Sequence, residues 1–428
     1  MTMNAKRRRA HDKLAALPGV RAVRRPIRPR CDVAGQAAPG DDEEFDLFYV
    51  RTGRKSAHPL VIIPGGPGAA SIALYRGFRR RAVAEGLDVI MVEHRGVGMS
   101  RHDDSGSDLP PEALTIDQVV DDVAAVLDDA QVDKAAIYGT SYGTYVAAGV
   151  GARHPDRVHG MILDSPVLSA HDIDAVRDAT RRLLWDGDTP ETADLAPKVR
   201  RLVDQDRLSP AATQLAAAVY GLAGPAVLRR QLDLLLAGRR SLWWVLGQAA
   251  RFLLERKAPY RHEPDLVGRI GYRELNYGAI PDGKPLDPAV AFRELATGTT
   301  EFEAEPFDFI NEMPKFTWPT VIISGGRDLI TPPAVACRIA SLIPGAVLVN
   351  LATAGHSAID LRERAALDII KATYDGVSSG LPARAEKLDS TPGGLGVRLL
   401  IWAIAAAAAA EKALPAAVPR KVQRVTVS

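Results

Sequence analysis

A serine flanked by glycines, at the junction of a predicted strand and a predicted helix, constrains this chain more than any other feature. The sequence GTSYG at residues 139–143 follows a short apolar run at residues 135–138 and opens an amphipathic segment at residues 142–153. Small residues two positions before and after the serine allow a tight turn that exposes its hydroxyl above a helix N-terminus. The pattern therefore predicts that Ser141 is a nucleophile.

Short apolar runs and longer helical segments alternate on both sides of this turn. Runs rich in Val, Ile or aromatic residues, as in buried strands, lie at residues 45–50, 60–63, 89–92, 135–138 and 161–163. Such alternation predicts βαβ units, and hence a mostly parallel sheet with helices on both faces. Helical stretches dominate from about residue 170 to residue 302, and strand signals return at residues 320–324 and 346–351. The simplest architecture is a sheet interrupted by a helical insertion.

The 428 residues divide into five predicted segments. These are a basic N-terminal arm (1–31), the first part of the sheet domain (32–170), a helical cap insertion (171–310), the second part of the sheet domain (311–380) and a C-terminal tail with an Ala-rich helix (381–428). A chain with 46% hydrophobic residues can fill such a core, which excludes a disordered or low-complexity protein.

The charge distribution and the cysteines indicate which partners and which cellular compartment to expect. Residues 1–31 hold ten Lys and Arg against the single acid Asp12, and the rest of the chain is acidic overall. With no aromatic residues interleaved, this segment is interpreted as a solvated arm, and no nucleic-acid partner is expected. No apolar signal region follows it, and Cys31 and Cys337 show neither a disulfide framework nor zinc-ligand spacing. We therefore expect a cytoplasmic protein.

The C-terminal tail contains the apolar run LLIWAIAAAAAA at residues 399–410. A bilayer span needs about 20 such residues, and this run has twelve. Because alanine is the strongest helix former, we expect a terminal helix docked on the body or on a partner subunit. Peripheral membrane contact through this helix is the less favoured alternative.

Two loops after the returning strand signals supply partners for the serine. Asp328 lies in GGRDLITP after residues 320–324, and His356 lies in AGHS after residues 346–351. A serine hydroxyl needs a base to take its proton, and the base needs a carboxylate to fix its tautomer. The chain order Ser, Asp, His is that of an α/β-hydrolase. Asp164 is the main rival acid, and the other eight histidines do not follow a late strand on a glycine-containing loop.

Two glycine-containing loops follow earlier strands. The sequence PGGPG at residues 64–68 suits an oxyanion hole, in which backbone N–H groups stabilise the negative oxygen of an acyl-transfer intermediate. Because proline has no N–H, we expect the donor to be Gly66, with Gly65 as an alternative, paired with the N–H of Tyr142. The sequence EHRGVGMS at residues 93–100 lacks the third glycine of a dinucleotide site, so we interpret it as a tight loop at the carboxyl edge of the sheet.

With these residues in place, the chain resembles the proline iminopeptidase and tripeptidyl aminopeptidase group of serine α/β-hydrolases. The matching segments, in order, are PGGPG at Pro64, EHRGVGMS at Glu93, YGTSYGTY at Tyr138, HPDRV at His154, GGRDLITPP at Gly325 and GHS at Gly355. The resemblance implies the α/β-hydrolase fold with an inserted helical cap, and a serine aminopeptidase. It also implies cap acids that hold the amino group of the substrate. No motif selects one among Glu274, Asp282, Glu301, Glu303, Glu305 and Asp308.

These observations predict a hydrolase that acts on a peptide or small acyl substrate and needs neither a metal nor an organic cofactor. A carboxylesterase or other small-ester hydrolase is the first alternative, because the same triad serves esters and a fold does not fix its substrate. A non-catalytic binding protein on a hydrolase scaffold is the second.

Overall fold

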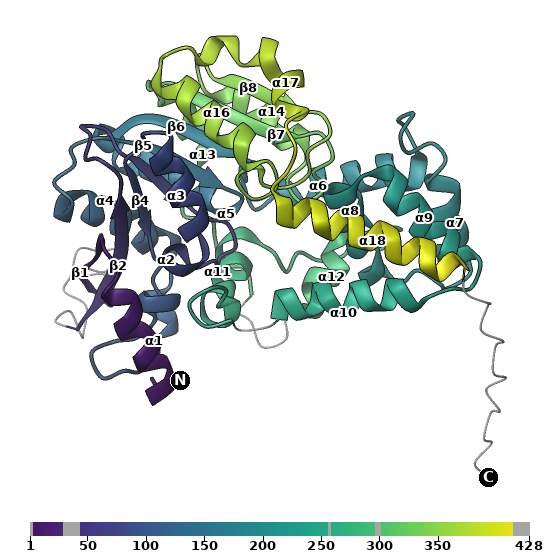
Figure 1. Cartoon of the computed structure of the whole chain (residues 1–428), viewed down its shortest axis with the longest axis horizontal. Coiled ribbons are helices and arrows are strands. Elements are labelled where there is room, and N and C mark those ends of the chain that lie inside the picture. Colours follow the sequence, from purple (N-terminus) through teal and green to yellow (C-terminus); the bar gives the residue numbers. More distant parts are fainter. Residues whose placement is uncertain (1–2, 29–42, 256–257, 296–300, 414–428) are drawn as a thin grey trace.

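The computed structural model describes residues 3–28, 43–255, 258–295 and 301–413. An eight-stranded sheet in the order β1-β2-β4-β3-β5-β6-β7-β8 forms its centre (Figure 1). The strands are β1 (Val20–Pro26), β2 (Glu44–Thr52), β3 (Leu60–Ile63), β4 (Val89–Val92), β5 (Ala135–Thr140), β6 (Val158–Asp164), β7 (Thr320–Gly325) and β8 (Val347–Leu351). β1 and β2 are antiparallel to their neighbours, and β3 to β8 are parallel. The mostly parallel sheet predicted from the alternating pattern is confirmed.

Helices surround the sheet and fill the interval between β6 and β7. Those outside this interval are α1 (Ala5–Ala15), α2 (Ser71–Leu74), α3 (Arg76–Ala84), α4 (Ile116–Asp129), α5 (Tyr142–Arg153), α14 (Pro333–Leu342), α15 (Ala358–Leu361), α16 (Glu363–Tyr374), α17 (Ala385–Asp389) and α18 (Leu395–Ala413). Those inside it are α6 (Asp172–Arg181), α7 (Ala196–Asp204), α8 (Pro210–Ala223), α9 (Pro225–Leu236), α10 (Ser241–Glu255), α11 (Pro264–Leu275), α12 (Pro288–Leu295) and α13 (Phe309–Glu312).

The buried strands place alternate residues on opposite faces of the sheet, as a period of two requires. Val61 and Ile63 of β3 pack in one core with residues of α4, α5 and α14. Leu60 and Ile62 pack in a second core with residues of α3 and α16. Both faces are therefore covered, which explains why these strands read as continuous apolar runs.

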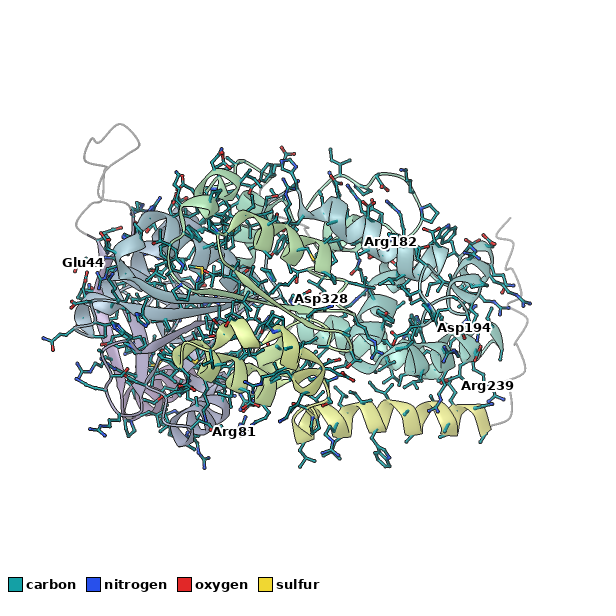
Figure 2. The ribbon with its side chains drawn as sticks, turned by 90° about the horizontal axis from the view of Figure 1, so that it is seen from above. Glu44, Arg81, Arg182, Asp194, Arg239 and Asp328 are labelled. Atoms are coloured by element: carbon teal, nitrogen blue, oxygen red, sulfur yellow. The ribbon has the colours of Figure 1, made fainter. Side chains whose placement is uncertain are left out.

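Helices between β6 and β7 form a cap with a core of its own, whereas α11 and α13 of the same interval pack in the core of the sheet. Residues of α7, α8 and α9 pack together there, and Leu329, from the loop after β7, joins them. In Figure 2 the labelled Asp328 lies where the sheet meets the cap, whereas Arg182 and Asp194 mark the cap itself. The insertion thus lies beside the carboxyl end of β7, where Leu329 packs in the core of the cap.

The basic N-terminal segment is not a solvated arm, and this interpretation was wrong for the described residues 3–28. Residues of this segment form α1 and then β1, which pairs antiparallel with β2 along its whole length. Arg25 donates to the buried Asp122, and Arg7 pairs with the buried Glu263. Acidic residues far along the chain neutralise these arginines, and no local charge pattern reveals that pairing.

The Ala-rich run lies within α18, which lies along α9 and α10 (Figure 1). Ile404 and Ala408 are its buried residues, and Ile404 joins the core of the cap. None of the described helices is both long and apolar enough to cross a membrane. Cys337 is an exposed free thiol, and Cys31 lies outside the described residues.

Candidate active site

Ser141 sits on a strained turn between β5 and α5. Its backbone has φ 52° and ψ −126°, a conformation that residues other than glycine rarely adopt. A Cβ added to Gly139 would lie 2.3 Å from the carbonyl oxygen of Gly143, and one added to Gly143 would lie 2.1 Å from that of Ile63. Both glycines are needed because strand, turn and helix approach one another too closely for any side chain. This is the turn that the flanking glycines predicted.

Three of the predicted residues form one hydrogen-bonded chain. The Oγ of Ser141 lies 2.8 Å from Nε2 of His356, and Nδ1 of the same ring lies 2.8 Å from Oδ2 of Asp328. A carboxylate only accepts hydrogen bonds, so Nδ1 carries the proton of the neutral ring and Nε2 is free to accept from the serine. The loops after β5, β7 and β8 thus come together, and the hydrogen bond between Ser141 and His356 joins residues 215 positions apart in the chain.

The carboxylate of Asp328 is held rigidly by its own loop. Oδ1 accepts from the backbone N–H groups of Ile330 at 2.8 Å and Thr331 at 3.0 Å, and Oδ2 accepts from Oγ1 of Thr331 at 2.9 Å. Burial alone raises the pKa of this carboxyl, but His356 and the two N–H donors outweigh it and hold the pKa below its ordinary value. Asp328 therefore stays ionised beside the histidine.

Asp164, the other candidate for the acid, accepts hydrogen bonds from groups other than the ring of His356. It accepts from Tyr138 Oη at 2.7 Å and from the N–H groups of Ala358 at 2.9 Å and Ile359 at 3.0 Å. These bonds fix the start of α15, which directly follows the loop of His356. Asp164 thus fixes the segment that follows His356. The carboxylate in contact with the histidine ring is that of Asp328.

The PGGPG loop passes directly over the nucleophile. A Cβ added to Gly65 would lie 3.1 Å from Cβ of Ser141, and Gly66 has φ 131°, which favours glycine. The N–H of Ala70 donates to the carbonyl of Arg261 at 2.9 Å, so a segment of the cap holds the end of this loop. The loop therefore lies beside Ser141, and the assignment of the oxyanion donor to Gly66 or Gly65 stays a prediction.

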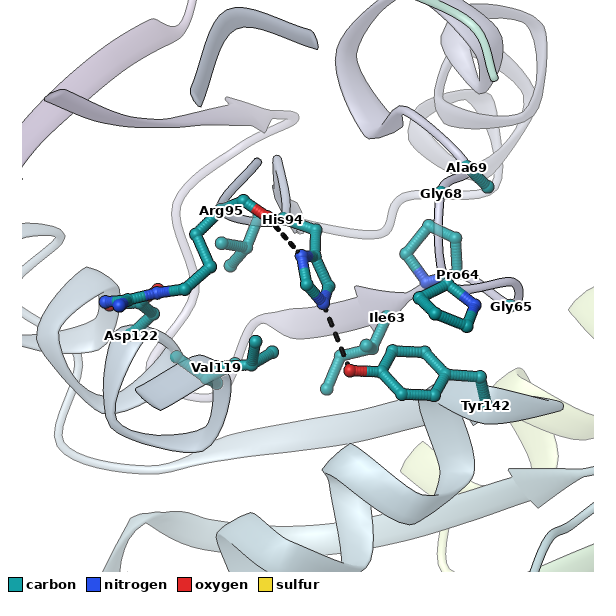
Figure 3. Close-up of a pocket in the computed structure, with 13 residues that line it drawn as sticks. Ile63, Pro64, Gly65, Gly68, Ala69, His94, Arg95, Val119, Asp122 and Tyr142 are labelled. Atoms are coloured by element: carbon teal, nitrogen blue, oxygen red, sulfur yellow. Dashed lines mark hydrogen bonds and ion pairs between the residues drawn. The ribbon is translucent and has the colours of Figure 1, made fainter. Parts of the chain in front are cut away.

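Tyr142 is held by a histidine that the sequence analysis left without a role (Figure 3). His94 lies with Nε2 3.1 Å from Oη of Tyr142 and with Nδ1 2.6 Å from the carbonyl oxygen of Arg95. Burial lowers the pKa of His94 to about 4, so the ring is neutral, donates from Nδ1 and accepts from the tyrosine. The small cavity beside this pair measures about 20 Å³, which is room for one water and not for an acyl group.

Two other residues of the EHRGVGMS segment form buried polar contacts near the PGGPG loop. Glu93 is buried and accepts from the N–H groups of Ser71 at 2.6 Å and Ile72 at 2.9 Å, which open α2 directly after that loop. Burial raises the pKa of Glu93 to about 7. Arg95, also buried, donates to both carboxylate oxygens of Asp122 at 2.6 and 2.7 Å. Sequence reasoning placed this loop at the correct edge but missed its bracing role.

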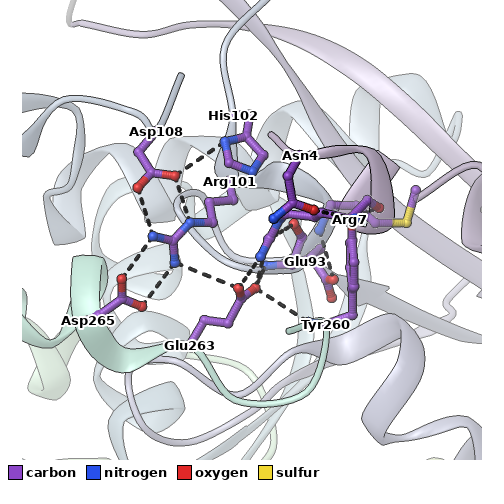
Figure 4. Close-up of polar contacts among 11 residues, drawn as sticks. Asn4, Arg7, Glu93, Arg101, His102, Asp108, Tyr260, Glu263 and Asp265 are labelled. Atoms are coloured by element: carbon purple, nitrogen blue, oxygen red, sulfur yellow. Dashed lines mark hydrogen bonds and ion pairs between the residues drawn. The ribbon is translucent and has the colours of Figure 1, made fainter. Parts of the chain in front are cut away.

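A second ionic cluster joins the N-terminus, the sheet and the cap (Figure 4). Glu263, at the start of α11, accepts from Arg7 of α1 at 3.0 Å and from the N–H of Gly98 at 2.7 Å. Arg101 donates to both Asp108 and Asp265. The N–H of Glu263 also donates to the carbonyl of Gly68, so α1 supports the PGGPG loop through this cap segment. A basic residue near the chain start carried no sequence signal for such a role.

The six cap acids that the sequence left open have different surroundings. Glu301, Glu303 and Asp308 are exposed, and Asp282 pairs with Arg181. Glu274 is buried, accepts from the N–H of Ile116 at 2.8 Å and pairs with Arg273. Glu305 lies 3.4 Å from Oη of Tyr145, and burial raises its pKa. The geometry does not assign the amino group of a substrate to any of them.

We expect kcat/KM to fall at low pH as His356 gains a proton. Burial disfavours the imidazolium, but the Asp328 carboxylate outweighs this, so the pKa of His356 lies above its ordinary value of 6.5. Only the neutral ring can accept the proton of Ser141, so activity is present above this pKa and lost as the pH falls through it. The check is a pH profile with a cleaved substrate that has no group titrating near neutral pH. An acid limb centred below 6.5 contradicts this geometry.

Comparisons with known proteins agree with this architecture. Residues 58–203 match the family model described as the alpha/beta hydrolase fold. A proline iminopeptidase of Neisseria meningitidis serogroup A is 22% identical over 323 residues, which cover 74% of this chain and 89% of that protein. Rhodomycin D methylesterase of Streptomyces peucetius is 25% identical over 316 residues, covering 74% of this chain and 90% of that protein.

Other matches cover shorter segments or the fold alone. The proline iminopeptidase of Arabidopsis thaliana is 24% identical over 159 residues, which are 36% of this chain and 39% of that protein. Among solved structures, a thermophilic esterase from Thermogutta terrifontis has 18% identity and a TM-score of 0.45, covering 84% of this chain and 99% of that chain. The chain therefore has the α/β-hydrolase fold and is similar to proline iminopeptidases, as its motifs predicted.

Proposed function

We propose that this protein is a serine aminopeptidase, which releases an N-terminal residue, with proline the first candidate, or a short peptide through an acyl-enzyme. The observation that carries the proposal is the hydrogen-bonded chain from Ser141 through His356 to Asp328, with both bonds at 2.8 Å. These distances suit a nucleophile, a general base and an orienting acid.

In the first half-reaction, Oγ of Ser141 attacks the scissile carbonyl carbon while Nε2 of His356 takes the hydroxyl proton. The carbonyl π electrons move to its oxygen, and the N–H groups of Tyr142 and Gly66 stabilise that oxyanion. The Asp328 carboxylate stabilises the imidazolium. When the C–N bond breaks, Nε2 returns the proton to the leaving nitrogen, so an amine departs and an ester on Ser141 remains.

Water completes the cycle. It attacks the ester carbonyl as Nε2 of His356 takes one of its protons, and the second tetrahedral intermediate uses the same N–H donors. The ester C–O bond then breaks, and Oγ of Ser141 regains its proton from the imidazolium. The released product is the carboxylic acid of the N-terminal residue or peptide.

The cap contacts the loops that carry the proposed catalytic residues. Gly221 of α8 lies so close to the histidine loop that a Cβ added to Gly355 would be 2.3 Å from its carbonyl oxygen. Arg327, next to Asp328, pairs with Glu191 of the cap at 2.6 Å. Several similar proteins are named proline iminopeptidase, which supports an aminopeptidase.

A small-ester hydrolase is the second candidate. The similar methylesterase of Streptomyces peucetius covers as large a share of this chain as the Neisseria peptidase does, with a slightly higher identity. The proposed triad chemistry applies to both substrates, since only the leaving atom changes from nitrogen to oxygen.

A matched substrate panel distinguishes an aminopeptidase from a small-ester hydrolase. Prolyl, alanyl and tripeptidyl p-nitroanilides are compared with the same compounds acetylated at the amino group, and with p-nitrophenyl acetate and butyrate. We expect cleavage of the free amides, loss of turnover on acetylation and no turnover by the Ser141→Ala variant. Rapid ester hydrolysis with no cleavage of any free amide would favour the esterase instead.

A further inference from the structure

A groove of about 500 Å³ lies at the edge of the sheet opposite the catalytic loops. It is bounded by α3, by the end of β2 and by the turn that precedes β1. Thr52 in its wall pairs with Val89, the first residue of β4, so the groove faces the amino ends of the parallel strands. Ser141, Asp328 and His356 all follow carboxyl ends. The groove is therefore separate from the proposed active site.

The lining of this groove is strongly positive. Four arginines contribute to it, and no acidic residue does among the residues described. Arg51 is neutralised by Asp88 at 2.7 Å. Arg76 and Arg80, both exposed on α3, have no ion-pair partner in the described part of the chain, whereas their neighbour Arg81 (labelled in Figure 2) pairs with Glu363. The groove thus holds cations without counter-charges.

The fourth arginine, Arg79, is 4% exposed and incompletely satisfied. Its two terminal nitrogens donate to the carbonyls of Ser71 and Ile72, both at 2.6 Å. Its Nε is buried and has no hydrogen-bond partner within the described residues. Burial also lowers the pKa of Arg79 to about 10, a sign that its charge is poorly compensated.

A second unsatisfied atom lies in the same wall. The Oγ1 of Thr52 is buried and lacks a partner in the part of the chain that the structure describes. Other buried polar atoms of the described chain also lack a partner, so these two support a binding site only together with the charge of the groove. Nε of Arg79 can only donate and the threonine hydroxyl can donate, so the missing group is an acceptor. In a groove with uncompensated positive charge, an anionic acceptor fits best.

We propose that this groove binds a phosphorylated organic molecule. Arginine guanidinium groups match the geometry and charge of a phosphate, and Arg76 and Arg80 supply two that have no ion pair in the described chain. Its volume lies in the range of small-molecule sites and far exceeds one phosphate ion. Leu17, Val50 and Val83 supply apolar surface for the organic part. The ligand does not contact the triad, so this site is additional to the proposed aminopeptidase site.

Binding is tested on the full chain by isothermal titration calorimetry at constant ionic strength. The probes are phenyl phosphate and inorganic phosphate, with benzoate and benzyl alcohol as the carboxylate and neutral analogues. We expect saturable binding of phenyl phosphate, weaker binding of inorganic phosphate and no heat from benzyl alcohol. Equal affinity for benzoate would overturn the phosphate assignment, and the absence of saturable binding would overturn the site.

Substitutions test whether phenyl phosphate binds in this groove. Arg76→Gln/Arg80→Gln should weaken phenyl phosphate binding by at least about tenfold, because two charge-assisted contacts are lost. Thr52→Val keeps the shape and charge of the wall and should weaken binding by roughly fivefold. The charge-matched control is Arg201→Gln/Arg230→Gln, two exposed cap arginines with no ion pair in the described chain, which should bind like the unmodified protein. Equal weakening in the control would refute a specific groove.

Further measurements test whether each variant is folded and whether the ligand is a soluble molecule or a lipid. Thermal unfolding without ligand shows whether each variant is folded, and Ser141→Ala should bind phenyl phosphate as tightly as the unmodified protein. Vesicles of phosphatidylglycerol distinguish a lipid headgroup from a soluble ligand. Arginine-dependent vesicle binding without any binding of phenyl phosphate would contradict the small-molecule proposal.

Discussion

Replacing Ser141 with alanine should reduce kcat by a factor on the order of 10⁶ for every substrate the protein cleaves. The hydroxyl is the nucleophile of the proposed acyl-enzyme, and no other hydroxyl lies within hydrogen-bond distance of Nε2 of His356 in the described structure. Alanine retains Cβ, so the turn with φ 52° is unchanged and the thermal unfolding midpoint should move little. Initial rates with the best substrate of the panel provide the measurement.

A fluorophosphonate probe gives an independent readout of the same serine. The unmodified protein should be labelled once, Ser141→Ala should not be labelled, and the exposed control Ser341→Ala should react like the unmodified protein. Failure of the unmodified, folded protein to react would identify a non-catalytic scaffold. Labelling that persists in Ser141→Ala would place the nucleophile elsewhere.

Asp328→Asn should lower kcat by about 10⁴ through the tautomer of His356. Oδ1 of Asp328 accepts two backbone N–H bonds, so the asparagine will place its carbonyl oxygen there and its NH₂ group at the position of Oδ2. That NH₂ donates to Nδ1 of His356, which now sits opposite a donor instead of a carboxylate. The ring then carries its proton on Nε2 and cannot accept one from Ser141.

Asp164→Asn is the matched control, since it also changes a buried carboxylate near the histidine loop. It weakens the bonds to Tyr138 and to the N–H groups of Ala358 and Ile359, so we expect a lower unfolding midpoint and a much smaller loss of kcat. Asp164→Asn proving the more damaging to kcat, in protein that is still folded, would reverse the assignment of the acid.

The sheet and the triad were predictable because each depends on a local pattern. Ser141 stands between a strand run and a helix, and Asp328 and His356 each follow a strand run on a glycine-containing loop. Parallel strands bring their carboxyl ends to one edge, so sequence position alone implies that the three side chains converge. The structure adds the distances and the tautomer.

The supporting shell was not predictable, because its contacts are long-range and polar. Glu93 accepts N–H groups from α2, 21 and 22 residues earlier. Glu263 meets Arg7 across 256 positions. A carboxylate in a buried loop and an arginine near the chain start have many possible partners, and no periodicity identifies the right one. His94 carried one usable signal, a histidine directly after a buried strand, but its partner Tyr142 could not be inferred.

The strand β1 has a consequence for how copies of this molecule meet. Among the described strands it lies at the end of the sheet, and an open strand edge can pair with a strand of another molecule. Arg21 and Arg24 are exposed along β1, and Pro26 at its end has no N–H to offer. A second sheet approaching this edge would have to desolvate those charges and lose a ladder bond. Exposed charges and a terminal proline on an edge strand are features that disfavour association between sheet edges, and β1 has both.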